Sequence, residues 1–120
     1  MPLRARQSRF ALNVSRLIAF AFGQGYELTL GEAFRTEYQQ AYYVKIGMSK
    51  TMNSRHLQRL AVDFNLFRGG ELLGDAEDFR PLGEYWATLD PDNVWGGDWD
   101  RDGSTDDETF KDPYHFEMKP

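Results

Sequence analysis

The sequence predicts an α+β fold in which about three helices pack on a small, mostly antiparallel sheet. Three observations lead to this prediction. Apolar residues recur at helical spacing in two stretches, 5–24 and 78–89. Residues 62–67 instead alternate between apolar and polar side chains, as a half-buried strand does. The length of 120 residues is enough for one modest core and not for two, so we expect a single domain over residues 1–120.

The predicted helices are bounded by recognisable signals. The helix over 5–24 ends at two nearby glycines. Residues 32–40 are predicted to form a turn that leads into a second helix. The third helix, 78–89, has Asp78 as its predicted N-cap and Pro81 in its first turn, where proline is tolerated.

The predicted strands are short. The clearest covers 62–67, and a glycine turn after it predicts that residues 71–73 return beside it as a hairpin. Residues 45–55 lack periodicity and are predicted to be a loop. The remaining extended segments are residues 26–30, 94–95 and 114–119.

Composition excludes several classes of function. The absence of cysteine rules out a disulfide scaffold, a cysteine nucleophile and a thiolate metal site. The net charge of −5 argues against nucleic acid as a partner. No apolar run is long enough to span a membrane, and Asn13, Ser15 and Arg16 interrupt any signal-peptide core. We therefore expect a monomer that is made in the cytoplasm and binds neither nucleic acid nor membranes.

The chain contains two histidines, and both are placed so that they could share a metal ion with an aspartate. Asp63 follows His56 by seven residues, and His115 lies in the last predicted strand. Because side chains alternate between the two faces of a strand, Asp63 and His115 both point away from the apolar rows of their strands. If these strands are neighbours, both side chains reach one ion, with His56 over the same face. Two histidines and one aspartate leave a fourth position for water, as in catalytic rather than closed structural zinc sites.

Hydrolysis at such a site needs further groups. Zinc lowers the pKa of a bound water toward ~7 and polarises the attacked carbonyl. A carboxylate must take the proton of that water and pass it to the leaving amine. Asp112 is the first candidate, and Glu117 is the second. Arg35 is the candidate cation for the oxyanion. A lone histidine or aspartate is more often structural or solvated, so the metal site depends on further motifs.

Four short motifs occur in an order that strengthens this interpretation. They are Arg35-Thr36-x-x-Gln39, Ser54-x-His56-x(6)-Asp63, Gly96-Gly97-Asp98-Trp99 and Asp112-x-x-His115. Together they resemble the signatures of a zinc peptidase family that contains D-alanyl-D-alanine carboxypeptidases and dipeptidases and phage L-alanyl-D-glutamate endopeptidases. The resemblance covers about residues 28–117. One position departs from it: Arg59 stands where the family has glycine, so Arg59 either has an ordinary backbone conformation or reaches into the cleft.

The resemblance implies a role for each motif residue and a compact α+β fold shared with Hedgehog signalling domains. It implies that zinc is bound by His56, Asp63 and His115, and that Asp112 is the catalytic acid and base. It implies that Arg35 binds substrate or the oxyanion. The residues implied to lie near the substrate are Ser54, Gln39 and Trp99.

The substrate that the resemblance implies is the stem peptide of bacterial peptidoglycan, cleaved at the L-alanyl-D-glutamate bond. A D-alanyl-D-alanine carboxypeptidase is the alternative, and a non-catalytic wall-binding or signalling relative is another. Without a signal peptide the chain looks most like a phage endolysin, which reaches the cell wall through a holin or an equivalent.

The acidic stretch 98–108 supports a separate prediction. It begins as D-x-D-x-D-G, the opening of an EF-hand calcium loop, with possible ligands Asp98, Asp100, Asp102 and Ser104. The twelfth position, where that loop has glutamate, is Thr109, and Glu108 lies one residue short. The stretch is therefore either a calcium site or a solvated acidic turn, and a calcium-binding interaction domain is a rival function.

Overall fold

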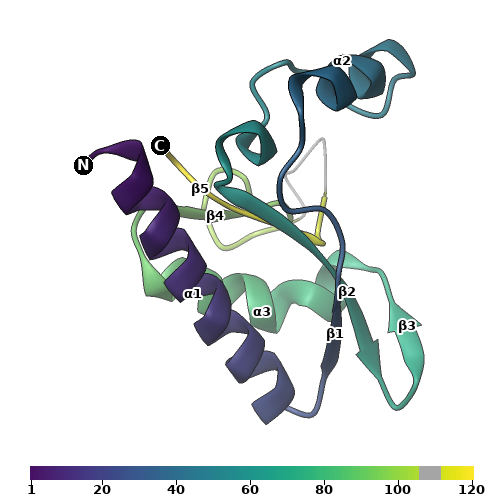
Figure 1. The fold of residues 1–120 in the computed structure, drawn as a ribbon. Helices are drawn as coiled ribbons and strands as arrows, with labels where there is room; N and C mark the ends of the chain where they lie inside the picture. The colour runs from purple at the N-terminus through teal and green to yellow at the C-terminus, as the bar shows by residue number, and fades with distance from the viewer. Residues whose placement is uncertain (106–111) are drawn as a thin grey trace.

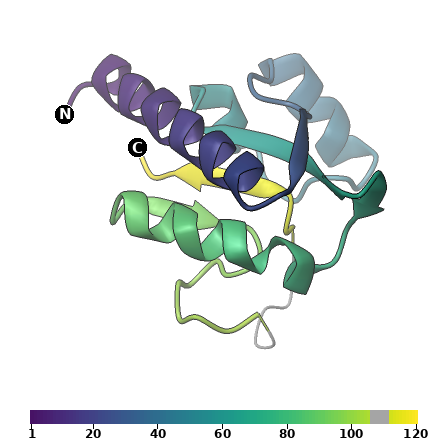
Figure 2. The same cartoon turned by 90° about the horizontal axis from the view of Figure 1, so that it is seen from below.

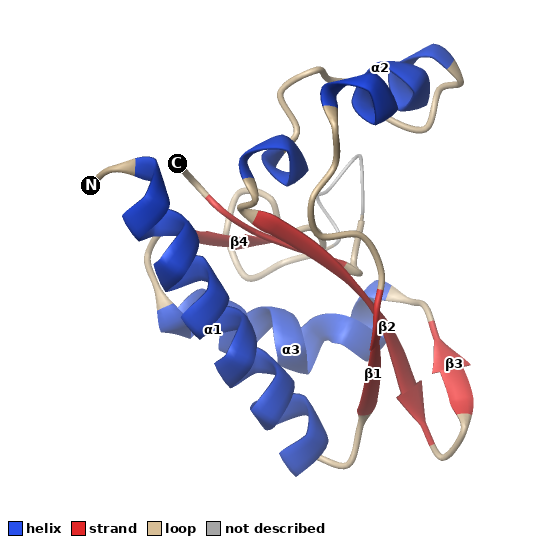
Figure 3. Ribbon diagram, viewed as in Figure 1, coloured by secondary structure: helices blue, strands red, loops and turns tan. Residues whose placement is uncertain are grey.

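The structure is a computed structural model that describes residues 1–105 and 112–120. Its elements have the predicted α+β composition (Figure 3). The helices are α1 (Leu3–Gly23), α2 (Glu37–Lys45), the 3₁₀ helix η1 (Arg55–Gln58) and α3 (Ala76–Leu89). The strands are β1 (Glu27–Leu30), β2 (Ala61–Arg68), β3 (Glu71–Leu73), β4 (Asn93–Trp95) and β5 (His115–Met118).

The strands form an antiparallel sheet organised around β2. The order is β1-β2-β5-β4, and β3 also pairs with β2. Along β2, Val62, Phe64 and Leu66 are buried in the core, whereas Asn65 is exposed. The predicted strand over 62–67 and its hairpin with 71–73 are therefore confirmed. The pairing of β2 with β5 sets the two strands in the register on which the site depends.

Helices α1 and α3 cover one face of the sheet, and α2 lies on the other side (Figures 1 and 2). Helices α1 and α3 contact each other through the stacked rings of Phe20 and Tyr85, whose centroids are 4.1 Å apart. Trp86 of α3 is fully buried, and its Nε1 donates hydrogen bonds to the carbonyls of Val94 and Glu117. These bonds attach α3 to β4 and β5. The apolar face of the sheet thus holds the core, and the opposite face is left for polar side chains.

Helix α2 follows the predicted turn. Residues 31 and 32 continue the pairing with β2, because Gly31 N donates to Asp63 O and Asp63 N donates to Glu32 O, each at 2.8 Å. The helix starts only after Thr36, whose side chain and that of Gln39 form a capping box. The predicted turn from residue 32 into a second helix is therefore confirmed, and the helix itself begins at Glu37.

Helix α3 begins earlier than predicted. Its N-cap is Asp75, and Asp78 is the third residue of the helix and the other half of a capping box. Asp78 is therefore not the N-cap, and Pro81 is the sixth helical residue rather than part of the first turn. Helix α1 matches its prediction within two residues at each end. Among the described residues, no helix combines the length and the apolar character needed to cross a membrane.

Candidate active site

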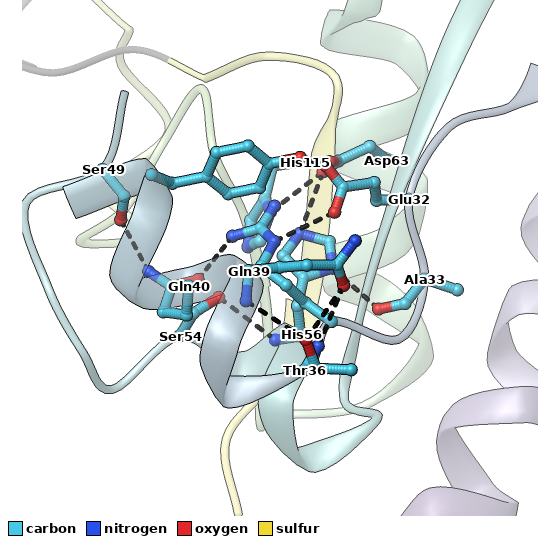
Figure 4. Close-up of polar contacts among 12 residues, drawn as sticks. Glu32, Ala33, Thr36, Gln39, Gln40, Ser49, Ser54, His56, Asp63 and His115 are labelled. Carbon is cyan, nitrogen blue, oxygen red and sulfur yellow. Dashed lines mark hydrogen bonds and ion pairs between the residues drawn. The ribbon is translucent and has the colours of Figure 1, made fainter. Parts of the chain in front are cut away.

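A cleft of about 470 Å³ opens on the polar face of the sheet. Its walls come from η1, β2, β5, the residues before α2, and the segment after α2. At its base the side chains of His56, Asp63 and His115 converge, and their ligand atoms all lie within 4.8 Å of one another. Nε2 of His56 lies 3.4 Å from Oδ1 of Asp63, and Nδ1 of His115 lies 3.1 Å from the same oxygen. Figure 4 shows these three residues together with Ala33 and Ser54, which contact His56.

The pleat of the sheet brings Asp63 and His115 together. They are directly opposed in the antiparallel pair of β2 and β5, and their neighbours Val62, Phe64 and Phe116 are in the core. This is the arrangement that alternation along the two strands predicts. Strand β5 begins at His115, one residue after the start of the predicted segment 114–119, and the Tyr114 side chain lines the cleft.

His56 is positioned by η1, which the sequence analysis did not predict. Ser54 is the N-cap of this short helix, and its Oγ accepts a hydrogen bond from His56 N at 3.3 Å. Ser54 also lines the cleft, which is where it was expected. The His56 side chain is only 2% exposed. Its backbone carbonyl accepts a hydrogen bond from Arg35 N at 3.2 Å, so η1 is attached to the segment before α2.

Arg59 ends η1 in a left-handed conformation, with φ 56° and ψ 37°. Its guanidinium lies 4.1 Å from the ring centroid of Phe34 and does not line the cleft. Both alternatives raised for this position were therefore wrong. Arg59 keeps the backbone conformation that a glycine adopts most readily, and a cation–π contact helps to offset the cost.

The hydrogen bonds of the two imidazoles suit the binding of a metal cation. Nδ1 of His56 lies 2.8 Å from the carbonyl of Ala33, which can only accept. Nε2 of His115 lies 2.8 Å from Oε1 of Glu117, which as a carboxylate can only accept. In its neutral form, which is the form that binds a metal, each ring carries its proton on the outer nitrogen and turns a lone pair toward Asp63. Two nitrogen lone pairs and one carboxylate oxygen facing a common point make a donor set that fits a divalent metal.

The electrostatics of the metal-free cluster also favour a cation. Burial lowers the pKa of His115, but hydrogen bonds with Asp63 and Glu117 outweigh it and raise the pKa to about 9. Burial raises the pKa of Asp63, but hydrogen bonds from the two histidines outweigh it and bring the pKa to about 2. The cluster therefore holds a proton between negative groups until a metal displaces it.

Asp112 lies in the wall of the same cleft and is unlike the other carboxylates there. Its Oδ1 is buried without a hydrogen-bond partner. Burial is the main reason that its pKa is raised, and the Asp63 carboxylate adds to the effect. Burial and Asp112 raise the pKa of Tyr114 to about 12, so the Tyr114 hydroxyl keeps its proton and can donate to Asp112.

Arg35 also lines the cleft, where a network of side chains holds its guanidinium. Nε donates to Oε2 of Glu32 at 3.0 Å, and Nη1 donates to Oε1 of Gln40 at 2.7 Å. The guanidinium lies 4.7 Å from the ring centroid of Tyr43, whose hydroxyl donates to Oε1 of Glu32 at 2.9 Å. Glu32, Gln40 and Tyr43 therefore hold the Arg35 guanidinium in the wall of the cleft.

In the structure the glutamine that contacts Arg35 is Gln40, and not Gln39 as the motif Arg35-Thr36-x-x-Gln39 suggests. Gln39 is exposed, caps α2 through Thr36 and does not line the cleft. Gln40 is fully buried, holds Arg35, and donates from Nε2 to Ser49 Oγ and Thr51 O (Figure 4). The structure therefore does not bring Gln39 into the cleft with the other predicted site residues. The full spacing Arg-Thr-x-x-x-Gln selects Gln40 and was the signal that could have found it.

The Gly-Gly-Asp-Trp motif supports the segment that carries Asp112. Gly96 N donates to His115 O, and Asp112 N donates to Gly96 O at 2.9 Å. A Cβ on Gly96 would lie 2.0 Å from the Asp112 carbonyl oxygen, so only glycine permits this approach. Trp99 lines the cleft as expected, with its ring centroid 5.4 Å from that of His115.

The acidic stretch has its own internal structure. Carboxylate oxygens of Asp98, Asp100 and Asp102 lie within 4.8 Å of one another, but they accept hydrogen bonds from backbone amides of the same loop. Strand β4 precedes the loop, where an EF-hand has a helix. Glu108 and Thr109 lie outside the described residues. Calcium binding, including any contribution from Ser104, stays a prediction.

Comparison with known proteins gives a consistent family. Residues 12–119 match the family described as phage L-alanyl-D-glutamate peptidase. The chain is 33% identical over 85 residues to an L-alanyl-D-glutamate peptidase of Listeria phage A118. This alignment covers 70% of the chain and 30% of the phage protein. It is 32% identical over 127 residues to the peptidoglycan L-alanyl-D-glutamate endopeptidase CwlK of Bacillus subtilis, in an alignment that covers 90% of this chain and 70% of CwlK. The chain thus spans under a third of the phage relative.

Two solved structures share the fold. The Serratia marcescens L-Ala D-Glu endopeptidase ChiX has a TM-score of 0.66 and 24% identity, covering 88% of this chain and 77% of that one. The vancomycin-resistance D,D-pentapeptidase VanY, solved in complex with Zn(II), has a TM-score of 0.59 and 20% identity, covering 92% and 70%. These likenesses confirm the predicted fold class, a small antiparallel sheet with helices as in the DD-peptidases.

Proposed function

Because the chain belongs to the phage L-alanyl-D-glutamate peptidase family, we propose that it hydrolyses the stem peptide of bacterial peptidoglycan. The bond is the one between L-alanine and D-glutamate, and the reaction depends on zinc. The observation that carries this proposal is the convergence of His56, Asp63 and His115 beside the buried, unpartnered Oδ1 of Asp112 in one cleft.

The metal ligands in this proposal are Nε2 of His56, a carboxylate oxygen of Asp63 and Nδ1 of His115. Zinc is the expected metal because two imidazoles and one carboxylate are its usual ligands in catalytic sites. When bound, it supplies an acidified water and a Lewis acid for the scissile carbonyl. VanY, which has the same fold, was solved with Zn(II).

Asp112 is the proton carrier in this proposal. A general base has to accept a proton from water and then release it to the amine of D-glutamate, and a raised pKa suits both steps near neutral pH. Its Oδ1 has no hydrogen-bond partner to compete with the water. The Tyr114 hydroxyl, whose pKa burial and the Asp112 carboxyl raise to about 12, stays protonated and can donate to that carboxyl.

The cation of Arg35 is the proposed partner of the oxyanion or of a substrate carbonyl. Its guanidinium is held by Glu32, Gln40 and Tyr43, so it does not have to reorganise as negative charge develops. Ser54 and Trp99 both line the cleft in which the peptide is proposed to bind. Both are proposed to contact the substrate.

The test is hydrolysis of purified peptidoglycan with and without a chelator, followed by mass spectrometry of the fragments. We expect chelator-sensitive release of fragments with a new N-terminal D-glutamate, and recovery when zinc is added back. Loss of terminal D-alanine would replace the proposal with a carboxypeptidase. A protein that binds one zinc and cleaves neither bond would be a non-catalytic relative, and melting that responds to calcium alone would favour the calcium-binding domain.

A further inference from the structure

We propose that Glu117 is a positioning residue that fixes the His115 ring so that Nδ1, and not Nε2, faces the metal. The inference rests on the metal site of the proposed function and assigns a role to a carboxylate that was at first a second candidate for the proton carrier. It separates the roles of the two carboxylates that were candidates for the proton carrier. Asp112 moves protons, and Glu117 holds the ligand.

The geometry of β5 supports this role. His115 and Glu117 are two residues apart on one strand, so their side chains lie on the same face. Oε1 of Glu117 is 2.8 Å from Nε2 of His115, while Nδ1 of the same ring is 3.1 Å from Oδ1 of Asp63. A neutral imidazole has one N–H and one lone pair. A carboxylate at Nε2 therefore keeps the proton there and leaves the lone pair on Nδ1.

His56 reaches the same result by a different route. Its outer nitrogen, Nδ1, faces the carbonyl of Ala33 at 2.8 Å, and its Nε2 faces Asp63. Both rings thus have the nitrogen remote from Asp63 engaged by a group that can only accept. For His56 that group is part of the backbone and cannot be removed by mutation. For His115 it is a side chain, so the effect can be measured directly.

Glu117 is itself held in place. Its side chain is 15% exposed, and Oε2 lies 3.8 Å from Nε of Arg55. Nη1 of Arg55 donates to Oε1 of Gln58 at 3.1 Å. Arg55 belongs to η1, so the short helix that carries His56 also supports the partner of His115. With one oxygen on His115 and the other toward Arg55, Glu117 is poorly placed to exchange protons with a substrate water.

The experiment compares the wild-type protein with Glu117→Gln and Glu117→Ala. Glu71→Ala, an exposed glutamate on β3, is the matched control. Zinc affinity is measured by competition with a chromogenic chelator, and kcat and KM are measured at saturating zinc. Because the chain has two histidines, ¹⁵N spectra of histidine-labelled protein contain two rings, and their shifts report which nitrogen is protonated in the metal-free and the zinc-loaded protein.

We expect Glu117→Ala to weaken zinc affinity about 10- to 100-fold, in the range found for outer-sphere partners of metal-bound histidine. Glu117→Gln should lose less, because its amide oxygen still accepts from Nε2. In both variants the reduction in kcat at saturating zinc should be smaller than the reduction in affinity. At a pH where the metal-free His115 ring is neutral, the spectrum of Glu117→Ala should show protonation divided between Nδ1 and Nε2 of His115 alone. The control should match wild type in every measurement.

Two results would overturn the inference. Unchanged zinc affinity and an unchanged His115 spectrum in Glu117→Ala would mean that the contact fixes nothing. A hundredfold lower kcat in Glu117→Gln at normal zinc affinity would make Glu117 the proton carrier instead. If Glu117→Ala does not fold, Glu117→Gln and its spectrum still decide. A wild type that fails to cleave peptidoglycan would end the proposed function while leaving the affinity and tautomer tests intact.

Discussion

At the scale of single residues, Asp112 differs from its neighbours because its Oδ1 is buried without a hydrogen-bond partner. The pKa of its carboxyl is raised in the folded protein, so above the unfolded pKa the charged form works against folding. Replacing it with asparagine removes that charge. We expect Asp112→Asn to lower kcat/KM on peptidoglycan by about 10²–10⁴-fold, with zinc stoichiometry unchanged and the melting temperature equal or higher. Full activity in this variant would exclude Asp112 as the proton carrier.

Gln40 and Gln39 offer a second test, because adjacent glutamines have different surroundings. Gln40→Ala leaves Nη1 of Arg35 without its partner and removes two bonds to the loop after α2. We expect about 1–3 kcal/mol of lost stability and at least a tenfold lower kcat/KM, because Arg35 is no longer held. Gln39→Ala removes half of a capping box and should cost about 1 kcal/mol or less with normal kcat/KM.

Urea unfolding and steady-state kinetics measure both effects of these glutamine substitutions. Equal kinetic losses in the two variants would mean that both glutamines act on the cleft. The pair also shows what sequence can say about single residues. Period-two alternation places Asp63 and His115 correctly because a strand has two faces. No periodicity distinguishes Gln39 from Gln40 in a loop that becomes a helix, where motif spacing is the better guide.

At the scale of elements, the strands and the long periodic helices were predictable, whereas the short helix η1 was not. Helix α1 and strand β2 match because each carries several turns or several alternations of apolar residues. Helix η1 has four residues, which is too few to show a helical period, so the sequence indicates only a loop. The sequence indicates a turn before α2 but not the residue where the helix begins. Backbone pairing of Glu32 with β2 extends the irregular segment, and such a long-range bond leaves no local signal.

Gly96 connects two elements and gives a prediction at this scale. A Cβ there would lie 2.0 Å from the Asp112 carbonyl oxygen, so Gly96→Ala must push the Asp112 segment away from β4. Displacement of a catalytic group by about 1 Å can cost about 10²-fold in rate. We expect Gly96→Ala to lower kcat by about 10- to 100-fold, measured on peptidoglycan with zinc present.

The control for this prediction is Gly74→Ala, where a Cβ would have nothing within 4 Å. Gly74 lies between β3 and α3, away from the cleft. The Gly74→Ala variant should keep wild-type kinetics and nearly wild-type stability. If Gly96→Ala also keeps wild-type kinetics, the close approach of Gly96 does not position Asp112.

At the scale of the whole molecule, the two faces of the sheet have different tasks. One face is sealed by α1 and α3 and contains the aromatic core (Figure 2). The other carries a buried charged cluster, which is expensive to maintain unless its charges are matched. A molecule of 120 residues has little stability in reserve, so the protonation of this cluster should be visible in global unfolding.

The sign of that effect follows from the two shifted groups. The pKa of His115 is about 9 in the metal-free fold and 6.5 for a free imidazole, so its stabilising contribution is complete below pH 6.5 and is lost as the pH rises through 9. The pKa of Asp63 is about 2 instead of 3.8, so its contribution is present above pH 3.8 and is lost as the pH falls through 2. Metal-free protein should therefore gain most from the cluster between about pH 4 and 6.5.

We expect the metal-free protein to lose roughly 1–3 kcal/mol of unfolding free energy from this cluster between pH 6.5 and 9.5. Urea titrations with a chelator measure the loss. With zinc the loss should disappear, since the ligand form of His115 is the neutral ring and a bound metal takes the place of the proton. The variant His115→Gln, which has no ring to titrate, should lack this pH dependence in both conditions. If the unfolding free energy of His115→Gln falls with pH as steeply as that of wild type, the titrating group is not His115. The protonated cluster would then not stabilise the metal-free fold.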